Sequence, residues 1–375
     1  MMGDYAKEAA RTMTSRGTGI LREQNEKRVL SLLRKKKEMT RKELMESLKV
    51  SKNTVSIIVD QYIKQGVIQE IGRKQPNKAG RPTVLLKLNP ALFETISMVI
   101  HPDSIEWSVY NYFLEPLQTE TVFLDTSDVQ TCVNQMLDII EEEQKNRKNV
   151  IGVGIAVPGI VDTSNGSVIS SVKLDWKNVP LGSYLKQSIS LPFYIQNNVK
   201  VAALCAIEEQ DEHAQTSFFY IRIGEGIGAA FVMNSQIWDG ETSTAGEIGH
   251  LSVNPDGPEC RCGQKGCLER LIGQKTFLEW TKKNGTVYEM QLELTKYGEY
   301  LSIPIMNIIH LLNPSHIIID SPYNDYDSFT DSVTRVLEER SRLTHGLGQE
   351  DLIFNEEPYS ELEGAALAMI LSYEE

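Results

Sequence analysis

Three cysteines within eight residues constrain this chain more than any other feature. Cys260, Cys262 and Cys267 have the spacing C-x-C-x4-C, and His250 precedes the first of them by ten positions. Four ligands of these types complete a tetrahedral zinc site that leaves no position open for chemistry. We therefore expect a structural Zn²⁺ ion in a loop over residues 250–267. The alternative is a set of reduced cysteines that bind no metal.

Two carboxylates flank this cysteine cluster. Glu247 lies three residues before the histidine, and Glu269 lies two residues after the last cysteine. A metal bound to the cluster would fix the two carboxylates relative to each other. The other two cysteines, Cys132 and Cys205, stand alone in apolar segments. This usage fits a metal site in a reducing cytoplasm better than disulfide bonds.

The sequence has no feature that predicts contact with a membrane. It has no run of about 18 apolar residues, which a membrane-spanning helix needs. The polar segment 1–19, which we expect to be flexible, lacks the apolar core of a secretory signal. We therefore expect a cytoplasmic protein without a membrane partner.

Charge is distributed unevenly along the chain. Residues 1–90 contain 20 Lys and Arg against 9 Asp and Glu, a net charge of +11, whereas the other 285 residues carry a net charge of −24. A basic block joined to an acidic body is typical of a nucleic-acid-binding module on a body that does not bind nucleic acid. A solvated basic tail is the alternative.

The basic block has the pattern of three short helices. Apolar residues recur at roughly helical spacing from about residue 20 to 36. Thr40 begins a second helix, because Glu43 follows it at the spacing of a capping box. A third amphipathic helix is expected over residues 52–65, and Gly66 ends it. The order predicts a helix-turn-helix.

Two strands, over residues 67–71 and 83–88, are expected after the helices, with a basic hairpin between them. This arrangement is that of a winged helix, which we assign to residues 20–90. Short polar residues at the start of the third helix suit base edges and phosphates, and an arginine in the wing suits a minor groove. The expected DNA-binding residues are Thr40, Ser51, Lys52, Asn53, Thr54, Ser56, Arg73, Lys78, Gly80 and Arg81. A three-helix domain without DNA-binding function is the alternative.

From residue 91 onward, strand patterns alternate with helix patterns, which predicts an α/β domain. Strands are expected over 96–100, 106–110, 150–157, 193–195, 217–223, a segment ending at 232, and 316–319. Helices are expected over 128–145, 199–208, 303–312 and 364–371.

Four motifs in this order resemble the ROK family of repressors, open reading frames and sugar kinases. They are EIGH followed by CxCGxxGCxE over Glu247–Glu269, VPGIVD over Val157–Asp162, DWKNVPL around Trp176 and GEGIGAAF over Gly224–Phe231. The likeness covers residues 91–375. A preceding winged helix with an AGRP wing matches the repressor branch, in which the closest general likeness is to xylose repressors. The resemblance implies a two-lobed, actin-like (RNase H-like) domain over residues 91–375 that binds an effector and oligomerises.

The resemblance also implies where an effector would bind, because family kinases hold a sugar between the two lobes. A carboxylate can accept two hydrogen bonds from paired sugar hydroxyls. His250 can bind zinc through one ring nitrogen and face the effector with the other. The implied effector-binding residues are Pro158, Gly159, Asn197, Asn198, Glu247, His250 and Glu269, together with Lys173. Surface solvation of the acids is the alternative.

Four departures from the kinase pattern predict that the chain is not an enzyme. Asn198 replaces the aspartate that serves as general base in the kinases, and an amide cannot accept a proton at neutral pH. The first phosphate turn has no glycine between Ser97 and Glu115. In the second, Glu225 replaces a threonine and puts a negative charge where a polyphosphate would lie. Asp320-Ser321 replaces a Gly-Gly pair.

Lys173 is a further departure, because many family members have an asparagine that touches the sugar at this position. A lysine is a good partner for a phosphate or carboxylate. An anionic effector, such as a sugar phosphate or sugar acid, is therefore one hypothesis. A lysine that points to solvent is the alternative.

These expectations together describe a repressor of carbohydrate-utilisation genes that a sugar or sugar-derivative effector controls. A homodimer, which could pair into a tetramer, would place two recognition helices on a palindromic operator. Three alternatives stay open: a catalytic ROK sugar kinase with a DNA-binding domain, a regulator controlled by a protein partner, and an activator.

Overall fold

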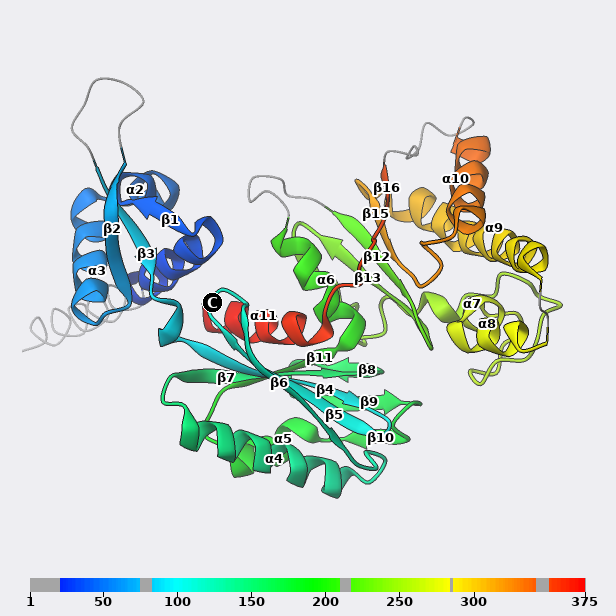
Figure 1. Cartoon of the computed structure of the whole chain (residues 1–375), viewed down its shortest axis with the longest axis horizontal. Coiled ribbons are helices and arrows are strands. Elements are labelled where there is room, and N and C mark those ends of the chain that lie inside the picture. Colours follow the sequence, from blue (N-terminus) through cyan, green and yellow to red (C-terminus); the bar gives the residue numbers. More distant parts are fainter. Residues whose placement is uncertain (1–20, 75–82, 210–216, 284–285, 342–350, 375) are drawn as a thin grey trace, which may run out of the picture.

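Three bodies make up the chain: a winged-helix domain and two lobes, each with a five-stranded sheet (Figure 1). The computed structural model describes residues 21–74, 83–209, 217–283, 286–341 and 351–374. No helix in these ranges is both long enough and apolar enough to cross a membrane.

The N-terminal domain confirms the predicted helix-turn-helix and both strands of the wing. It consists of a helix over residues 21–36, β1 (Glu38–Thr40), α2 (Arg41–Leu48), α3 (Lys52–Lys64), β2 (Ile68–Lys74) and β3 (Thr83–Leu88). Thr40 and Glu43 form the expected capping box at the start of α2. The short strand β1 was not predicted, and it extends the wing sheet to the order β1-β3-β2.

The first lobe contains a mixed sheet with the order β11-β7-β4-β5-β6. Its strands are β4 (Glu94–His101), β5 (Ser104–Asn111), β6 (Pro116–Phe123), β7 (Val150–Val157) and β11 (Phe193–Asn197), preceded by the 3-10 turn η1 (Pro90–Leu92). Helices α4 (Val129–Asn146) and α5 (Leu181–Ser188) lie below the sheet in Figure 1. A small sheet is formed by β8 (Ile160–Asp162), β9 (Ser167–Ser171) and β10 (Trp176–Val179). Strand β6 and the small sheet were not predicted.

The second lobe contains a sheet with the order β14-β13-β12-β15-β16. Its strands are β12 (Phe218–Ile223), β13 (Ile227–Met233), β14 (Gln236–Ile237), β15 (Ile317–Asp320) and β16 (Leu352–Phe354). Its helices are α7 (Leu268–Ile272), α8 (Gln274–Thr281), α9 (Val287–Leu312) and α10 (Asp327–Ser341). The helix predicted over 303–312 is only the end of α9, because the helix continues through Pro304, a residue that normally interrupts helices.

Two helices, α6 (Asn198–Glu208) and α11 (Glu361–Glu374), lie between the two large sheets (Figure 1). Helix α11 packs on β7 and β4 and against α6, while α6 also contacts β13 of the second lobe. Glycines permit this close approach. A Cβ on Gly154 would lie 1.9 Å from the Ala365 carbonyl oxygen, and one on Gly364 would lie 2.2 Å from that of Val201. The backbones of α6, α11 and β7 are therefore in direct contact.

The winged helix shares a hydrophobic core with the first lobe. Buried residues of the winged helix, such as Leu33 and Leu86, belong to one cluster with Tyr112, after β5, and Ile370 of α11. Aromatic contacts of Phe93 with Tyr112 and Tyr373 extend this junction. The winged helix is therefore packed onto the lobe and is not merely tethered to it.

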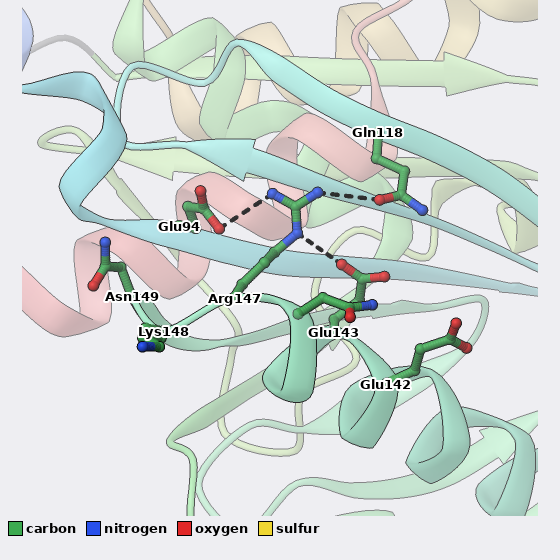
Figure 2. A pocket seen from close by; sticks show the side chains of 8 residues that line it. Glu94, Gln118, Glu142, Glu143, Arg147, Lys148 and Asn149 are labelled. Carbon is green, nitrogen blue, oxygen red and sulfur yellow. Dashed lines mark hydrogen bonds and ion pairs between the residues drawn. The ribbon is translucent and has the colours of Figure 1, made fainter.

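A shallow polar hollow of about 480 Å³ lies at the edge of the first lobe (Figure 2). In it, Arg147 contacts Glu143 at 2.7 Å, Glu94 at 3.3 Å and Gln118 at 3.1 Å. Glu143 belongs to α4, Glu94 to β4 and Gln118 to β6. The contacts with Arg147 therefore fix the end of α4 against the sheet.

Candidate functional site

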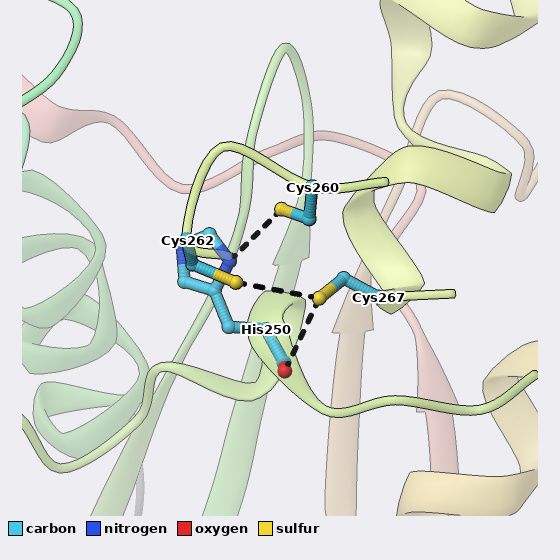
Figure 3. A group of neighbouring side chains, drawn as sticks. All are labelled: His250, Cys260, Cys262 and Cys267. Carbon is cyan, nitrogen blue, oxygen red and sulfur yellow. Dashed lines mark hydrogen bonds between the residues drawn. The ribbon is translucent and has the colours of Figure 1, made fainter. Parts of the chain in front are cut away.

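The predicted metal ligands come together (Figure 3). Each of the four residues offers one ligand atom, and these atoms all lie within 4.8 Å of one another. They are a ring nitrogen of His250 and the sulfurs of Cys260, Cys262 and Cys267. His250 Nδ1 lies 3.6 Å from Cys260 Sγ, and Cys262 Sγ lies 3.6 Å from Cys267 Sγ. Ligands around a tetrahedral zinc ion are separated by about 3.8 Å when the Zn–S bonds measure about 2.3 Å. The four side chains thus fit a tetrahedral metal ion.

Backbone pairing holds the loop in this shape. Isolated bridges join Ser252 to Cys267 and Glu259 to Lys265. Gly266 has a φ of 63°, and a Cβ there would lie 1.6 Å from the Asn254 carbonyl oxygen. Only glycine fits at this position, so the chain can fold back and present its last cysteine beside the first.

The environment of Cys267 favours a bound cation. Its side chain is completely buried, and burial raises the pKa of the thiol to about 12. A buried thiolate is unfavourable unless a cation compensates its charge, and a metal ion supplies that charge directly. The chemistry of the ligands therefore agrees with their geometry.

The two flanking carboxylates lie beside the His/Cys₃ cluster. Burial raises the pKa of Glu247, the charges of His250 and Lys200 oppose this rise, and the carboxylate of Glu269 adds to it. Glu247 is therefore close enough to His250, Lys200 and Glu269 to interact with each of them. Glu269 Oε2 accepts a hydrogen bond of 3.3 Å from the backbone N–H of Ile227. The fold thus brings the expected acids together.

Asn197, at the end of β11, connects this strand to the turn after β7 that contains Pro158 and Gly159. Its Nδ2 donates to the Gly159 carbonyl at 2.7 Å, and its Oδ1 accepts from the first N–H groups of α6. Gly159, in the turn after Pro158, has a φ of 123°, which favours glycine. Asn198 begins α6 and donates to the Glu361 carboxylate at 3.0 Å. Asn197 therefore supports the backbone at this site, whereas Asn198 binds a side chain of α11.

Lys173 forms an ion pair with Glu225, and their atoms Nζ and Oε2 lie 3.3 Å apart. Both residues depart from the kinase pattern, and the structure brings them together. Lys173 is neither a lone cation nor directed only at solvent.

Sequence reasoning missed a buried ion pair at this site. Lys200 of α6 is 3% exposed, and its Nζ lies 2.6 Å from Asp239 and 3.2 Å from the Ser243 carbonyl. Gln196 also donates to Asp239, at 3.3 Å. The only signal in the sequence was a lysine inside an alanine-rich helix, which by itself looks like a solvated residue.

A second polar network surrounds Asp320, one of the positions at which the sequence departs from the kinase pattern. Asp320 is 4% exposed, and it accepts hydrogen bonds from the Tyr220 hydroxyl at 2.5 Å and the Tyr359 N–H at 3.2 Å. Arg222 pairs with Glu361 at 3.4 Å and donates to the Tyr359 carbonyl at 3.1 Å. Each of these side chains therefore contacts another member of the network. Glu361 also accepts the hydrogen bond from Asn198.

The expected DNA-binding residues divide into three groups. Ser51, Lys52, Asn53 and Arg73 are exposed, and Thr54 and Ser56 are half-buried. Ser51 also caps α3 through the Thr54 N–H at 3.1 Å. Thr40 is only 4% exposed, because its hydroxyl caps α2, and this burial argues against its expected contact with DNA. Lys78, Gly80 and Arg81 lie outside the described residues.

Two features together indicate the class of protein. One is a winged helix packed on a body of two actin-like lobes, and the other is a His/Cys₃ cluster beside the carboxylates Glu247 and Glu269. The sequence matches the ROK family over residues 103–372 and winged helix-turn-helix DNA-binding domains over residues 22–69. Because the first match covers most of its length, the chain belongs to the ROK family.

Similar proteins include both repressors and kinases. A xylose repressor of Caldicellulosiruptor bescii is 26% identical, over 86% of this chain and 89% of its own. The DNA-binding transcriptional repressor Mlc of Escherichia coli is 24% identical, over 72% and 73%. A solved ROK family transcriptional regulator, described as a homologue of E. coli Mlc, covers 94% of this chain and 97% of its own, with a TM-score of 0.75 and 22% identity. A ROK glucokinase from Streptomyces griseus, solved with glucose and AMPPNP, covers 73% and 98%, with a TM-score of 0.60 and 20% identity. These solved structures support the predicted fold.

Proposed function

We propose that this protein is a sugar-responsive DNA-binding transcriptional repressor of carbohydrate-utilisation genes. The observation that carries the proposal is the combination of a winged helix, packed onto the body, with the carboxylates Glu247 and Glu269, which lie close to each other in that body. The repressors among the similar proteins support the same conclusion.

The proposed DNA contacts are the exposed start of α3 (Ser51, Lys52, Asn53), the neighbouring Thr54 and Ser56, and the wing residues Arg73, Lys78, Gly80 and Arg81. In a homodimer, two such surfaces would meet successive major grooves of a palindromic operator. A tetramer is the further possibility for the assembly, and the cytoplasm is the proposed location.

The proposed effector-binding residues are Pro158, Gly159, Lys173, Asn197, Asn198, Glu247, His250 and Glu269. A structural Zn²⁺ ion held by His250 and the three cysteines would fix the imidazole and the two acids in place. Metal ligation through Nδ1 would leave Nε2 of the same ring for a sugar hydroxyl.

We propose an uncharged sugar as the effector and a sugar phosphate as the second candidate. The ion pair between Lys173 and Glu225 supports this order, because Glu225 offsets the cation that would attract a phosphate. The pair is largely exposed, so water screens both charges and its strength is modest.

We also propose that the protein does not phosphorylate its effector. An amide stands at the position of the general base, and Asp320 is engaged by Tyr220 and Tyr359 where the family has a glycine pair. A solved glucokinase shares the fold, so the residues at these positions, and not the fold, support this conclusion.

The test combines ligand binding, operator binding and catalysis on the full chain. An operator fragment is selected from random DNA, and its affinity is measured with and without D-xylose, D-glucose and glucose 6-phosphate. The proposal predicts tight operator binding that a neutral sugar weakens, and no sugar-dependent consumption of ATP. Operator binding that no sugar alters, or a sugar kinase activity, would refute it.

A further inference from the structure

A buried cluster of charges joins the winged helix to the body. Arg34, in the helix over residues 21–36, is 3% exposed. Its Nε and Nη2 contact the two carboxylate oxygens of Glu374 at 2.8 and 3.2 Å, and its Nη1 contacts Glu208. The Tyr112 hydroxyl donates to Glu374 at 2.8 Å. The guanidinium thus binds one residue near the end of each of the helices α6 and α11.

The two carboxylates bind Arg34 differently. Glu374 makes a bidentate contact and is also held by Tyr112, and its side chain is 6% exposed. Glu208 has a single contact with Arg34, a long contact of 3.9 Å with Lys35, and a side chain that is 20% exposed. Bidentate contacts are the more strongly fixed. Glu208 can therefore separate from Arg34 while Glu374 keeps the guanidinium paired.

Helix α6 connects this cluster to the candidate effector site. Its first turn is held by Asn197, which also binds Gly159, and Lys200 of the same turn pairs with Asp239. Its last residue is Glu208. The helix has 11 residues and is therefore about 16 Å long. A rigid helix of this length carries a displacement at Asn197 and Lys200 to the contact with Arg34.

We infer that Arg34 is a positioning residue that couples the effector site to the DNA-binding domain through Glu208 and α6. The pair with Glu374 holds the winged helix on the body, and the pair with Glu208 reports the position of α6. When an effector shifts the start of α6, the contact with Glu208 changes and the winged helix reorients. This inference rests on the proposed sugar-responsive function.

The decisive variant is Glu208→Gln, which removes one charge from the α6 contact and leaves the bidentate pair intact. Its matched control is Glu209→Gln, the same change one residue later, where the carboxylate contacts the Tyr359 hydroxyl and not the winged helix. Arg34→Lys tests whether a positive charge without the planar fork is sufficient.

Two measurements distinguish coupling from a merely structural role. The first is the ratio of operator Kd values with and without D-xylose or D-glucose, using the selected operator fragment. Coupling between two sites typically changes affinity by about 5–150-fold. We expect Glu208→Gln to move this ratio toward about 1, with melting temperature and sugar-free operator affinity unchanged. Glu209→Gln should retain the wild-type ratio.

The second measurement needs no sugar. Hydrogen exchange of the full chain should become faster in the first turn of α6, residues 198–201, in Glu208→Gln and Arg34→Lys but not in Glu209→Gln. Changes confined to residues 30–38 and 205–209 would overturn the inference, as would a wild-type affinity ratio in Glu208→Gln. If the wild-type protein responds to neither sugar, the proposed effector fails, and the exchange at residues 198–201 alone decides the coupling.

Discussion

Asn198→Asp is the substitution that most directly tests the network between the lobes. The change restores the carboxylate of a kinase at one position, but the structure predicts instability and no activity. In the wild-type protein, the amide nitrogen of Asn198 donates to Glu361 Oε1 at 3.0 Å. In the variant, two carboxylates would face each other across this distance.

The magnitude follows from the distances. At an effective dielectric constant of about 20, two like charges about 3 Å apart repel by about 5 kcal/mol. The attraction of Arg222, which lies 3.4 Å from Glu361, and the favourable position of an acid at a helix N-terminus offset part of this repulsion. We therefore expect the free energy of unfolding to fall by about 2–4 kcal/mol near neutral pH.

The loss of stability in Asn198→Asp should depend on pH. Repulsion raises the pKa of the new carboxyl in the folded state above its value of about 3.9 in the unfolded state. The folded state then binds the proton more tightly, so the loss of stability is largest at neutral pH and disappears as the pH falls toward about 4. Urea unfolding at a series of pH values measures this trend.

Two further variants make this test specific. Asn198→Ala removes the hydrogen bond without adding a charge, so it should cost about 1 kcal/mol at every pH. Adding Glu361→Gln to Asn198→Asp should restore most of the lost stability. If Asn198→Asp and Asn198→Ala are equally stable at neutral pH, the contact between residues 198 and 361 is not as described. A gain of sugar kinase activity would contradict the expectation that the other departures from the kinase pattern, such as Glu225 and Asp320, also prevent phosphoryl transfer.

Three other substitutions test the metal loop, the DNA-binding domain and the helix that packs on the first lobe. Cys267→Ser should abolish bound zinc in elemental analysis and lower the melting temperature, whereas Cys132→Ser, at a buried thiol far from the cluster in sequence, should retain the metal. Zinc occupancy of the wild-type protein should fall as the pH is lowered, because protons compete for thiolates. Ser51→Ala removes the cap of α3 and should cost about 1 kcal/mol in urea unfolding, with Ser56→Ala as a control that keeps the cap. Gly154→Ala places a Cβ 1.9 Å from a carbonyl oxygen of α11 and should cost more than about 4 kcal/mol or prevent folding, which soluble yield and melting curves measure.

Features set by nearby residues could be predicted from the sequence. The capping box of Thr40 and Glu43 depends on a spacing of three residues, and the hydrogen bonds of both partners are present at the start of α2. The strand predicted over 150–157 is β7. The proposed metal ligands His250 and Cys260 also lie within one short loop, so their spacing in the sequence indicates their proximity in space.

Features that depend on the packing of distant segments could not be predicted. Lys200 and Asp239 form a buried pair only because α6 lies beside the loop after β14. Neither residue has a sequence pattern that distinguishes it from a solvated charge. The pairing of Glu225 with Lys173 could not be predicted either. From the sequence, Glu225 was interpreted only as a negative charge at the position where a polyphosphate would lie.

The shared core between the winged helix and the first lobe also sets an order for folding. Arg34 and Glu374 are separated by 340 residues, yet they form one buried pair. Contacts between such distant segments form late, because a long loop must close before they are made. During synthesis, a ribosome that has released residues 21–88 has not yet made α11, so the winged helix still exposes the surface that Ile370 and Glu374 later cover. The DNA-binding domain therefore reaches its final position only after both lobes have been synthesised.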